Sequence, residues 1–425
     1  MGENSILTSL QKEQNSKSSL KMAFMNMANS IIGAGIIGQA YAVKKSGLLG
    51  GIFLLVSLTF VVDWTIRLMV VNAKMSATDS YQATVTRCFG RAGLLAISIA
   101  QGAFAFGGSI AFCVIIGDTI PHVIGAVFPS VRSSEGFIGF LVRRNTIIML
   151  FTLLISYPLS LNRDISKLAK ASAVALLSMV VIVLVVVIRG PAISTDLKGG
   201  AFTIPLLTVN TGFFQGISII SFAFVCHHNS LLIYQSLRQP TLDRFATLTH
   251  WSTFVSMIAC LALGLGGFLV FRDKTLGNLL NNFAGDDVYA NLARFCFGFN
   301  MLTTLPLEIF VCREVLLNYF FRDSEYSKLR HFVTTTVLVV TAMAVALSTC
   351  NLGAILELVG AFSASTMAYI LPPMCFLKLS TKKSGWRDRA LPTACIVFGV
   401  VVMVLSSAQT IFSMINDTET SHCSV

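Results

Sequence analysis

Apolar runs of about twenty residues, long enough to cross a bilayer as helices, recur along the chain from Leu20 almost to Met414. Inside a bilayer each backbone N–H and C=O needs a partner within the protein, and an α-helix pairs them within one segment. Only 12% of the 425 residues are charged, whereas a soluble protein carries about a quarter. The runs therefore predict an all-α polytopic membrane protein.

Polar or Pro/Gly-containing breaks divide the chain into eleven expected transmembrane helices. We place them at residues 20–43, 47–72, 93–120, 144–161, 168–189, 209–235, 247–271, 288–316, 332–350, 353–377 and 391–414. With the N-terminus in the cytosol, the inner segments hold more than twice as many Lys and Arg residues as the outer ones, which is the bias that orients membrane proteins. An odd number of spans then places the two termini on opposite sides.

The segments outside the spans are too short to fold alone, so function is expected within the membrane. We expect residues 1–19 to form a short cytosolic tail and residues 415–425 a short non-cytosolic tail. The first apolar run is too long for a signal peptide, so we expect no cleavable leader. Ten cysteines show neither metal spacing nor a disulfide framework, and we interpret most of them as packing residues.

The net charge of +11 does not indicate a nucleic-acid-binding protein. The basic residues form short clusters between apolar runs, whereas phosphate binding needs a basic face on a soluble domain. The six histidines are dispersed except for His227 and His228, which argues against a di-metal membrane enzyme. We therefore expect no enzyme activity, no metal site and no nucleic-acid partner.

The first span contains polar residues and glycines where leucine would be expected. Asn26, Asn29 and Ser30 precede Gly33 and Gly35, and glycine weakens a helix by about 1 kcal/mol relative to alanine. A break here would expose the N-terminus of an outer half-helix, which attracts an anion such as a carboxylate. The alternative is that these small residues only admit a neighbouring helix.

The sixth span has a matching interruption, five spans after the first. Four polar residues, from His227 to Ser230, interrupt an apolar segment, and we expect the break within Ser221–Cys226. Broken helices at corresponding positions of two halves are typical of inverted-repeat transporters. For His228 and Asn229 we favour the alternative that they are interfacial residues near the cytosolic end.

The eighth span contains Thr303, Thr304, Pro306 and Glu308. Proline removes a backbone donor and frees a carbonyl one turn earlier. Carbonyls and threonine hydroxyls could bind a small cation, although the threonines could also bond back to their own helix. Glu308 is a candidate proton relay or, alternatively, a partner for Arg313.

Three other acidic residues lie within spans. Asp63 and Arg67 are four residues apart on one helical face, and we favour a structural ion pair there. Asp118 in the third span and Glu357 in the tenth have either a structural or a functional role.

These residues resemble a known family. Asn29–Gly38, followed by Ala40-Tyr41-Ala42, resembles the first-helix signature of the amino acid/auxin permeases. Ser221–Ser230 resembles the sixth-helix signature of their sodium-coupled neutral amino acid transporter branch, especially its eleventh member and the fungal vacuolar amino acid transporters. Ile116-Gly117-Asp118 and the Thr304–Pro306–Arg313 spacing also match, and the likeness covers nearly the whole chain.

The resemblance implies a LeuT-like fold with two inverted five-helix repeats, at residues 20–189 and 209–377, and an eleventh helix at 391–414. It implies a monomeric secondary transporter that moves amino acids, neutral ones in particular, by alternating access. The coupling ion would be Na⁺ or H⁺, with no other cofactor. An amino-acid-gated channel or a nutrient sensor of the same fold is the alternative.

The resemblance also assigns residues to the site. Amino acid would bind between broken helices one and six, on Ser30, Ile31, Gly33, Ala34, Gly35, Ser221, Phe222 and Ala223. Asn29 matches the cation-site asparagine of the branch, and Thr303 or Thr304 matches its partner in helix eight. The fungal relatives suggest a vacuolar, lysosomal or other endomembrane location, with the plasma membrane as the alternative.

Overall fold

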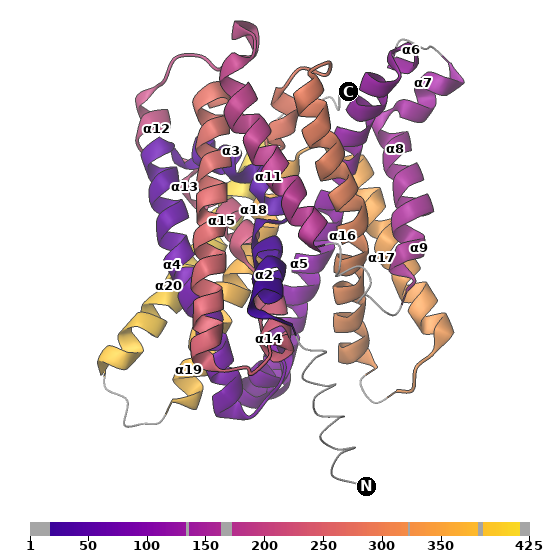
Figure 1. Cartoon of the computed structure of the whole chain (residues 1–425). Coiled ribbons are helices and arrows are strands. Elements are labelled where there is room, and N and C mark those ends of the chain that lie inside the picture. Colours follow the sequence, from indigo (N-terminus) through magenta and orange to yellow (C-terminus); the bar gives the residue numbers. More distant parts are fainter. Residues whose placement is uncertain (1–17, 133–135, 163–171, 322–323, 381–385, 417–425) are drawn as a thin grey trace.

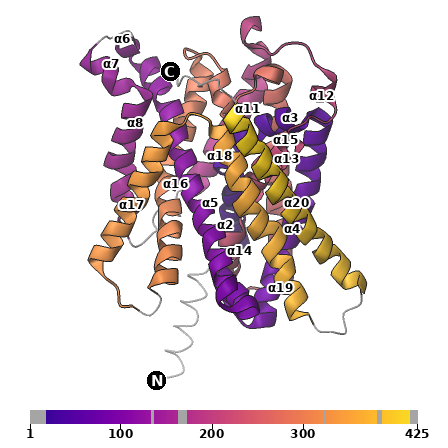
Figure 2. The ribbon, with the colours of Figure 1, turned by 180° about the vertical axis from the view of Figure 1, so that it is seen from behind.

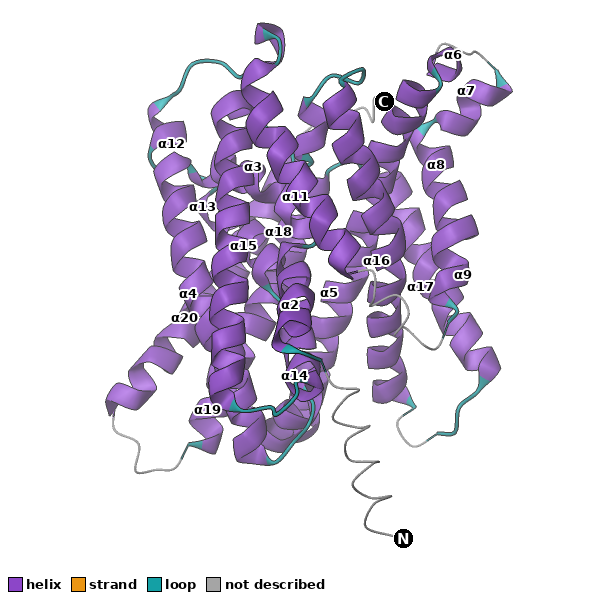
Figure 3. Cartoon of the chain, viewed as in Figure 1, coloured by secondary structure: helices purple, strands orange, loops and turns teal. Residues whose placement is uncertain are grey.

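The computed structural model describes residues 18–132, 136–162, 172–321, 324–380 and 386–416. Within these residues the chain is helical and contains no β-strand (Figure 3). One isolated β-bridge joins Ser18 to Leu237. Parts of the expected tails, residues 1–17 and 417–425, lie outside the described residues. The all-α prediction is confirmed.

Ten helical stretches of the described chain are long and apolar enough to cross a membrane. They are α2–η1–α3 (Leu20–Ser46), α4 (Leu48–Ser76), α5 (Tyr81–Val127), α11 (Ser172–Arg189), α13–α14 (Phe213–Ser236), α15 (Leu242–Phe271), α16 (Val288–Phe320), α17 (Lys328–Ser348), α18–η7–α19 (Leu352–Leu379) and α20 (Trp386–Asn416). Most of them run side by side along one axis (Figure 1).

The expected span at 144–161 is present as a shorter helical run. It consists of α8 (Arg144–Phe151), the π-helical turn η2 (Thr152–Ser156) and α9 (Tyr157–Ser160). Its length leaves it out of the ten, so the exact count of eleven is not confirmed. It lies at the edge of the bundle beside α17, and it contacts both α5 and α17 (Figures 1 and 2).

Short elements mark the two ends of the molecule. α6 (Pro129–Arg132), α7 (Phe137–Val142) and α12 (Ile204–Leu207) lie toward one end, and α14 and α19 lie toward the other (Figure 1). We name these the outer and inner ends, after the predicted orientation. The remaining 3₁₀ turns are η3 (Gly190–Ala192), η4 (Thr195–Leu197), η5 (Arg272–Lys274) and η6 (Leu279–Asn282).

Helix α5 is two helices joined at a kink. Gly90 has φ 61° and ψ −143° inside it, a backbone conformation that glycine adopts at little cost. The kink separates a short inner-end helix from the membrane span, which explains why the apolar pattern predicts a span beginning only at residue 93.

Both predicted helix breaks are present. In the first span α2 (Leu20–Ile32) ends at Gly33, a 3₁₀ segment η1 (Ala34–Gly38) follows, and α3 (Gln39–Ser46) completes the span. In the sixth span α13 (Phe213–Phe224) ends at Val225, whose ψ of 102° is extended, and α14 begins at His227. The two breaks face each other near the middle of the molecule, where α13 packs against η1 and α3.

Helix α16 stays continuous through Pro306. The proline cannot donate to the carbonyl of Leu302, four residues earlier. Ser156, on the π turn η2, donates its Oγ to that carbonyl at 3.1 Å instead. The carbonyl that we expected to be available to a cation is therefore already hydrogen-bonded to Ser156.

A second π-helical segment, η7 (Gly360–Ile370), links α18 (Leu352–Val359) to α19 (Leu371–Leu379). At its start an ideal Cβ on Gly360 would lie 1.9 Å from the carbonyl oxygen of Ser218, so only glycine fits there. This contact holds α13 against the tenth span. α20 packs along η7 and α19 and also contacts α13 (Figure 2).

Candidate functional site

A cavity of about 360 Å³ lies where the two broken helices meet α5 and α16. Its volume falls in the range of small-molecule sites, about 300–1,000 Å³. The lining comes from Ser18, Asn26, Asn29, Ser30, Ile31, Gly33, Ala34, Gly35, Phe104, Gly108, Phe112, Phe222, Ala223, His228, Asn229, Leu232, Ile233, Ser236, Asn300, Met301, Thr304, Leu307, Glu308 and Val311.

The break in the first span contributes backbone to the wall of this cavity. Gly33 N–H still bonds the carbonyl of Asn29, at 3.0 Å, as the last hydrogen bond of α2. Gly33, Ala34 and Gly35 line the cavity at the start of η1. N–H groups at the start of a helix have no partner within the helix, and the helix dipole makes this end partly positive. An anionic group is therefore favoured here.

The break in the sixth span is in direct contact with the break in the first span. An ideal Cβ on Gly35 would lie 2.5 Å from both the Cα and the Cβ of Ala223. Phe222 and Ala223 line the cavity at the C-terminal end of α13. Carbonyls at such an end have no helical partners and carry partial negative charge, which favours a cationic group.

Polar side chains of α2 and α14 face each other across the cavity. Asn229 donates from Nδ2 to Ser30 Oγ at 3.3 Å, and its Nδ2 lies 2.9 Å from Nε2 of His228. Asn29 Oδ1 is buried and has no hydrogen-bond partner. A buried amide oxygen without a partner costs about 1–3 kcal/mol, so Asn29 is suited to a cation or a donor group that enters the cavity.

His228 and Asn229, which we expected near the cytosolic end, both line the cavity. The preceding His227 is completely buried, with Nε2 3.0 Å from Thr65 Oγ1 of α4. The break at Val225 explains this position: α14 starts afresh at His227, so its first turn lies beside the cavity.

The two threonines of α16 have different environments. Thr304 lines the cavity, and its Oγ1 donates to Asn300 O at 2.8 Å and lies 3.1 Å from Asn300 Oδ1. Thr303 is absent from the lining and bonds only to the carbonyls of Phe299 and Asn300, at 3.3 and 3.0 Å. Helical geometry separates neighbouring positions by about 100°, so Thr304 faces the cavity and Thr303 does not.

Ser221 is likewise not part of the cavity. Its hydroxyl donates to Ile217 O at 2.7 Å and lies 2.8 Å from the hydroxyl of Tyr369 on η7. Seven of the eight residues that we expected to bind substrate do line the cavity: Ser30, Ile31, Gly33, Ala34, Gly35, Phe222 and Ala223.

An aromatic wall was not anticipated from the sequence. The Phe104 ring of α5 lies 5.2 Å from the Phe222 ring and 5.3 Å from the His228 ring, measured between centroids. Gly108 and Phe112, one and two turns along α5, continue this face. Their spacing of four residues places them on one face of the helix. A face that packs in the protein core has the same spacing as a face that lines a cavity. No sequence signal therefore distinguished these residues.

Glu308 lies on α16 and its side chain packs against this face of α5. An ideal Cβ on Gly108 would lie 3.7–3.9 Å from Cγ, Cδ and Oε2 of Glu308, so the carboxyl side chain covers that glycine. The alternative partner Arg313 donates elsewhere, to Ser160 O at 2.8 Å and Thr335 Oγ1 at 2.9 Å. The carboxyl group of Glu308 thus faces the cavity without an arginine beside it.

The cavity extends toward the inner end. Ser18, Leu232, Ile233 and Ser236, all at or beside the inner half of α14, belong to its lining. Ser18 N–H bonds the carbonyl of Ser236 at 2.7 Å, which attaches the start of the first span to the end of α14.

Two buried ionic networks close the outer end. Arg144 Nε lies 3.1 Å from Asp118 Oδ1, and Asn278 and Asn281 donate to Asp118 Oδ2 at 3.2 and 3.1 Å. In the second network Lys45 Nζ lies 3.7 Å from Glu357 Oε1, and Gln215 and Thr410 donate to Glu357 Oε2 at 2.9 and 2.8 Å. Asp118 and Glu357 therefore have structural partners.

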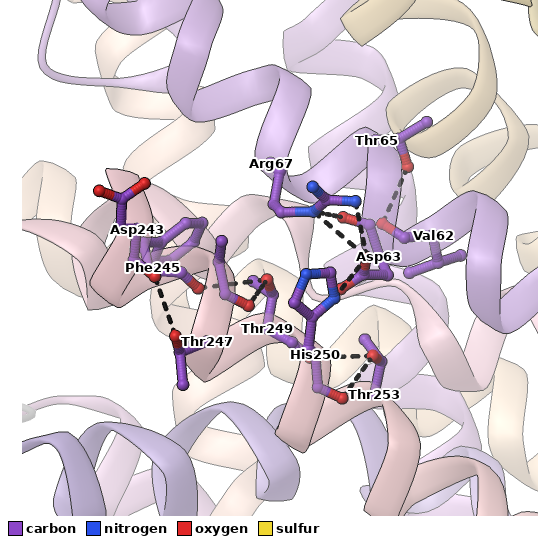
Figure 4. Close-up of polar contacts among 11 residues, drawn as sticks. Val62, Asp63, Thr65, Arg67, Asp243, Phe245, Thr247, Thr249, His250 and Thr253 are labelled. Carbon is purple, nitrogen blue, oxygen red and sulfur yellow. Dashed lines mark hydrogen bonds and ion pairs between the residues drawn. The ribbon is translucent and has the colours of Figure 1, made fainter. Parts of the chain in front are cut away.

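The predicted pair of Asp63 and Arg67 is also confirmed, outside the cavity. Arg67 Nη2 lies 2.9 Å from Asp63 Oδ2, and Nδ1 of His250 on α15 lies 3.0 Å from the same oxygen (Figure 4). The contact joins α4 to α15, and none of the three residues lines the cavity.

The interpretation of the cysteines holds for most of them. Seven of the eight free cysteines in the described residues are buried and one, Cys296, is half-buried. Cys350, between α17 and α18, is an exception, because it is disulfide-bonded. Among the described residues, no group of three His, Cys, Asp or Glu side chains could hold a metal ion.

Comparison with known proteins assigns the chain to one family. Residues 16–412 match the family described as transmembrane amino acid transporter protein. Vacuolar amino acid transporter 2 of Saccharomyces cerevisiae is 46% identical over 100% of this chain and 89% of its own length. Putative sodium-coupled neutral amino acid transporter 11 is 36% identical in Danio rerio, over 94% of this chain and 88% of the relative, and 35% identical in Homo sapiens, over 85% and 87%.

Proposed function

Since the chain belongs to the transmembrane amino acid transporter family, we propose that it is a secondary transporter that carries amino acids, neutral ones among them, by alternating access. Transport is coupled to Na⁺ or H⁺. The observation that carries the proposal is the cavity at the two facing helix breaks, which offers a partly positive helix start and a partly negative helix end within one space.

The main-chain groups of the cavity match the part that all amino acids share. The α-carboxylate fits the N–H groups of Ala34 and Gly35, which follow Gly33 at the start of η1, and the α-ammonium fits the carbonyl ends of α2 and α13, near Ile31 and Phe222. Recognition by backbone leaves the substrate side chain to the wall formed by Phe104, Met301 and their neighbours. That wall is mainly apolar, which suits neutral side chains.

The coupling cation is assigned to Asn29 and Thr304. Both line the cavity, and Asn29 Oδ1 lacks a partner. Amide and hydroxyl oxygens are ligands that small hard cations prefer. Glu308 is the alternative carrier if the coupling ion is a proton, because it is the carboxyl group of the cavity.

The positions of the cavity and of the ionic networks support alternating access. The cavity reaches the inner end, whereas Asp118–Arg144 and Lys45–Glu357 hold the outer end together. Transport requires a second state in which those outer contacts open. By analogy with the yeast relative named a vacuolar transporter, we place the protein in a vacuolar or other endomembrane.

The test is uptake of labelled amino acids into liposomes that contain the purified protein, with Na⁺ and pH gradients imposed separately. Saturable, gradient-driven uptake supports the proposal, and the effective gradient identifies the coupling ion. Ion current without substrate would indicate a channel instead. Binding of an amino acid without uptake under either gradient would indicate a sensor.

A further inference from the structure

Glu308 is the only Asp, Glu, Lys or Arg residue among the described residues that line the cavity. Its Oε2 is buried and has no hydrogen-bond partner. The wall behind it is Gly108, which offers no side chain. A carboxylate in such a place is costly unless a cation pairs with it.

The protein does not provide that cation within the described cavity. Arg313 is five residues along the same helix, but its guanidinium group donates to Ser160 and Thr335 and lies 3.9 Å from Glu314. The other titratable groups near Glu308 are His228, in the lining, and Cys312, whose Sγ contacts Gly102 O at 3.7 Å. The lining residues of α2, α5 and α13 include no titratable side chain.

The positive charge therefore has to come from what the cavity holds. Besides a coupling cation at Asn29 and Thr304, two sources are available. One is a proton on Glu308 itself. The other is the cationic end of a basic amino acid. Leu307, Val311 and Phe104 line the same region and suit the aliphatic stem of a lysine or arginine side chain. The aromatic pair Phe104 and His228 offers ring faces to a guanidinium group.

We propose that Glu308 lets one cavity carry both basic and neutral amino acids: ionised Glu308 pairs with the side-chain cation of a basic substrate, and protonated Glu308 accompanies a neutral one. The α-carboxylate and α-ammonium groups keep the same positions at the helix breaks in both cases. The charge of the loaded cavity is then the same for both substrates, because the proton and the side-chain cation replace each other. This inference rests on the proposed function, and it adds a substrate class and a role for Glu308.

The experiment compares arginine and glutamine in proteoliposomes at several pH values, with wild type, Glu308→Gln and Glu314→Gln. Glu314 is a matched control, since it lies on the same helix, its side chain is 43% exposed and it does not line the cavity. We expect Glu308→Gln to lose arginine uptake by about 10- to 100-fold, as expected for loss of a hydrogen bond between charged groups. Glutamine uptake should fall much less than arginine uptake and lose its dependence on pH, whereas Glu314→Gln should behave as wild type.

Three results would overturn the inference and leave the proposed function standing: wild type that carries glutamine but no arginine, Glu308→Gln that carries both equally, and Glu308→Gln that loses both. The unfolding temperature of Glu308→Gln shows whether this variant is folded. Glu308→Asp, which keeps a carboxyl group at this position, is the second variant measured. Binding of labelled arginine and glutamine to the detergent-purified protein gives a readout that does not need transport. If nothing is transported, the proposed function fails. Arginine binding that depends on Glu308 would still support the inference in that case. Arginine binding that does not depend on Glu308, or no arginine binding, would overturn it.

Discussion

Gly35 and Ala223 bring the two broken helices into direct contact: a Cβ on Gly35 would lie 2.5 Å from the Cα of Ala223 and 3.0 Å from its N. Real Cβ atoms do not approach backbone this closely, so one helix would have to move. The close packing of η1 on α13 beside the cavity therefore requires a glycine at residue 35.

We therefore expect Gly35→Ala to be more harmful than Gly33→Ala. A methyl group at Gly35 should cost about 1–3 kcal/mol through overpacking and reduce transport. At Gly33 the nearest atoms to a Cβ are the carbonyl oxygens of Asn29 and Ser30, at 3.5 and 4.0 Å, so Gly33→Ala should be tolerated. Unfolding temperature and uptake check both. Equal losses at the two positions would contradict the role assigned to the Gly35–Ala223 contact.

A larger side chain at Gly33 should act on transport rather than on folding. Gly33→Leu places an isobutyl group in the cavity lining, where the substrate carboxylate is expected. Uptake should be abolished while the protein still elutes as a folded species with an unfolding temperature near that of wild type. Normal uptake by this variant would refute the position proposed for the substrate carboxylate.

The cation assignment separates two adjacent threonines. Thr304→Val and Asn29→Ala should each weaken the apparent affinity for the coupling ion by about tenfold or more, the effect of losing a ligand worth about 1.5–3 kcal/mol. Thr303→Val is the matched control, because Thr303 does not line the cavity. The measurement is uptake at varied ion concentration. An unchanged ion dependence in Asn29→Ala would refute this site.

The outer network should be sensitive to the loss of one partner. Arg144→Gln leaves Asp118 buried without its cation, and breaking such a pair costs about 3–5 kcal/mol. The double variant Asp118→Asn/Arg144→Gln removes both charges and should recover part of the lost stability. Arg143→Gln, at an exposed neighbour, should have little effect. Thermal unfolding of the four proteins decides whether the network stabilises the closed outer end.

We expect Asp287, at the start of α16, to make a pH-dependent contribution to stability. Burial alone would raise the pKa of Asp287, but hydrogen bonds from the backbone N–H of Ala290 and from Arg189, together with the charge of Arg189, outweigh it and lower the pKa below its usual value. A lowered carboxyl pKa stabilises the folded state above the unfolded pKa of about 3.9, and the contribution is lost as the pH falls through the folded value.

Asp287→Asn keeps a side chain that can cap the helix and removes the charge. At pH 7 the free energy of unfolding of Asp287→Asn should be lower than that of wild type by about 1 kcal/mol or less. The two free energies should converge as the pH falls below about 4. Thermal unfolding across this pH range tests the expectation, with Asp286→Asn as the exposed neighbour. A difference that persists unchanged at low pH would show that the charge of Asp287 contributes nothing.

Several features of this protein follow from the sequence alone. The apolar runs require helices, because an unpaired backbone group is too costly in a bilayer. Gly33 and the polar residues from His227 onward indicate both helix breaks, since glycine and polar groups are the residues that least favour an uninterrupted apolar helix. The spacing of Asp63 and Arg67 is enough to predict their ion pair, because residues four apart share a helical face.

Other features depend on how the helices pack. Thr303 and Thr304 are indistinguishable in the sequence, and only the rotation of α16 directs Thr304 into the cavity. The carbonyl freed by Pro306 is available or occupied depending on whether Ser156 lies beside it. Whether Glu308 meets Arg313 or faces the cavity is likewise decided by contacts with Ser160 and Thr335, far away in the sequence. Backbone hydrogen bonding in a bilayer is local and can be predicted from composition, whereas the partners of buried side chains are set by the tertiary structure.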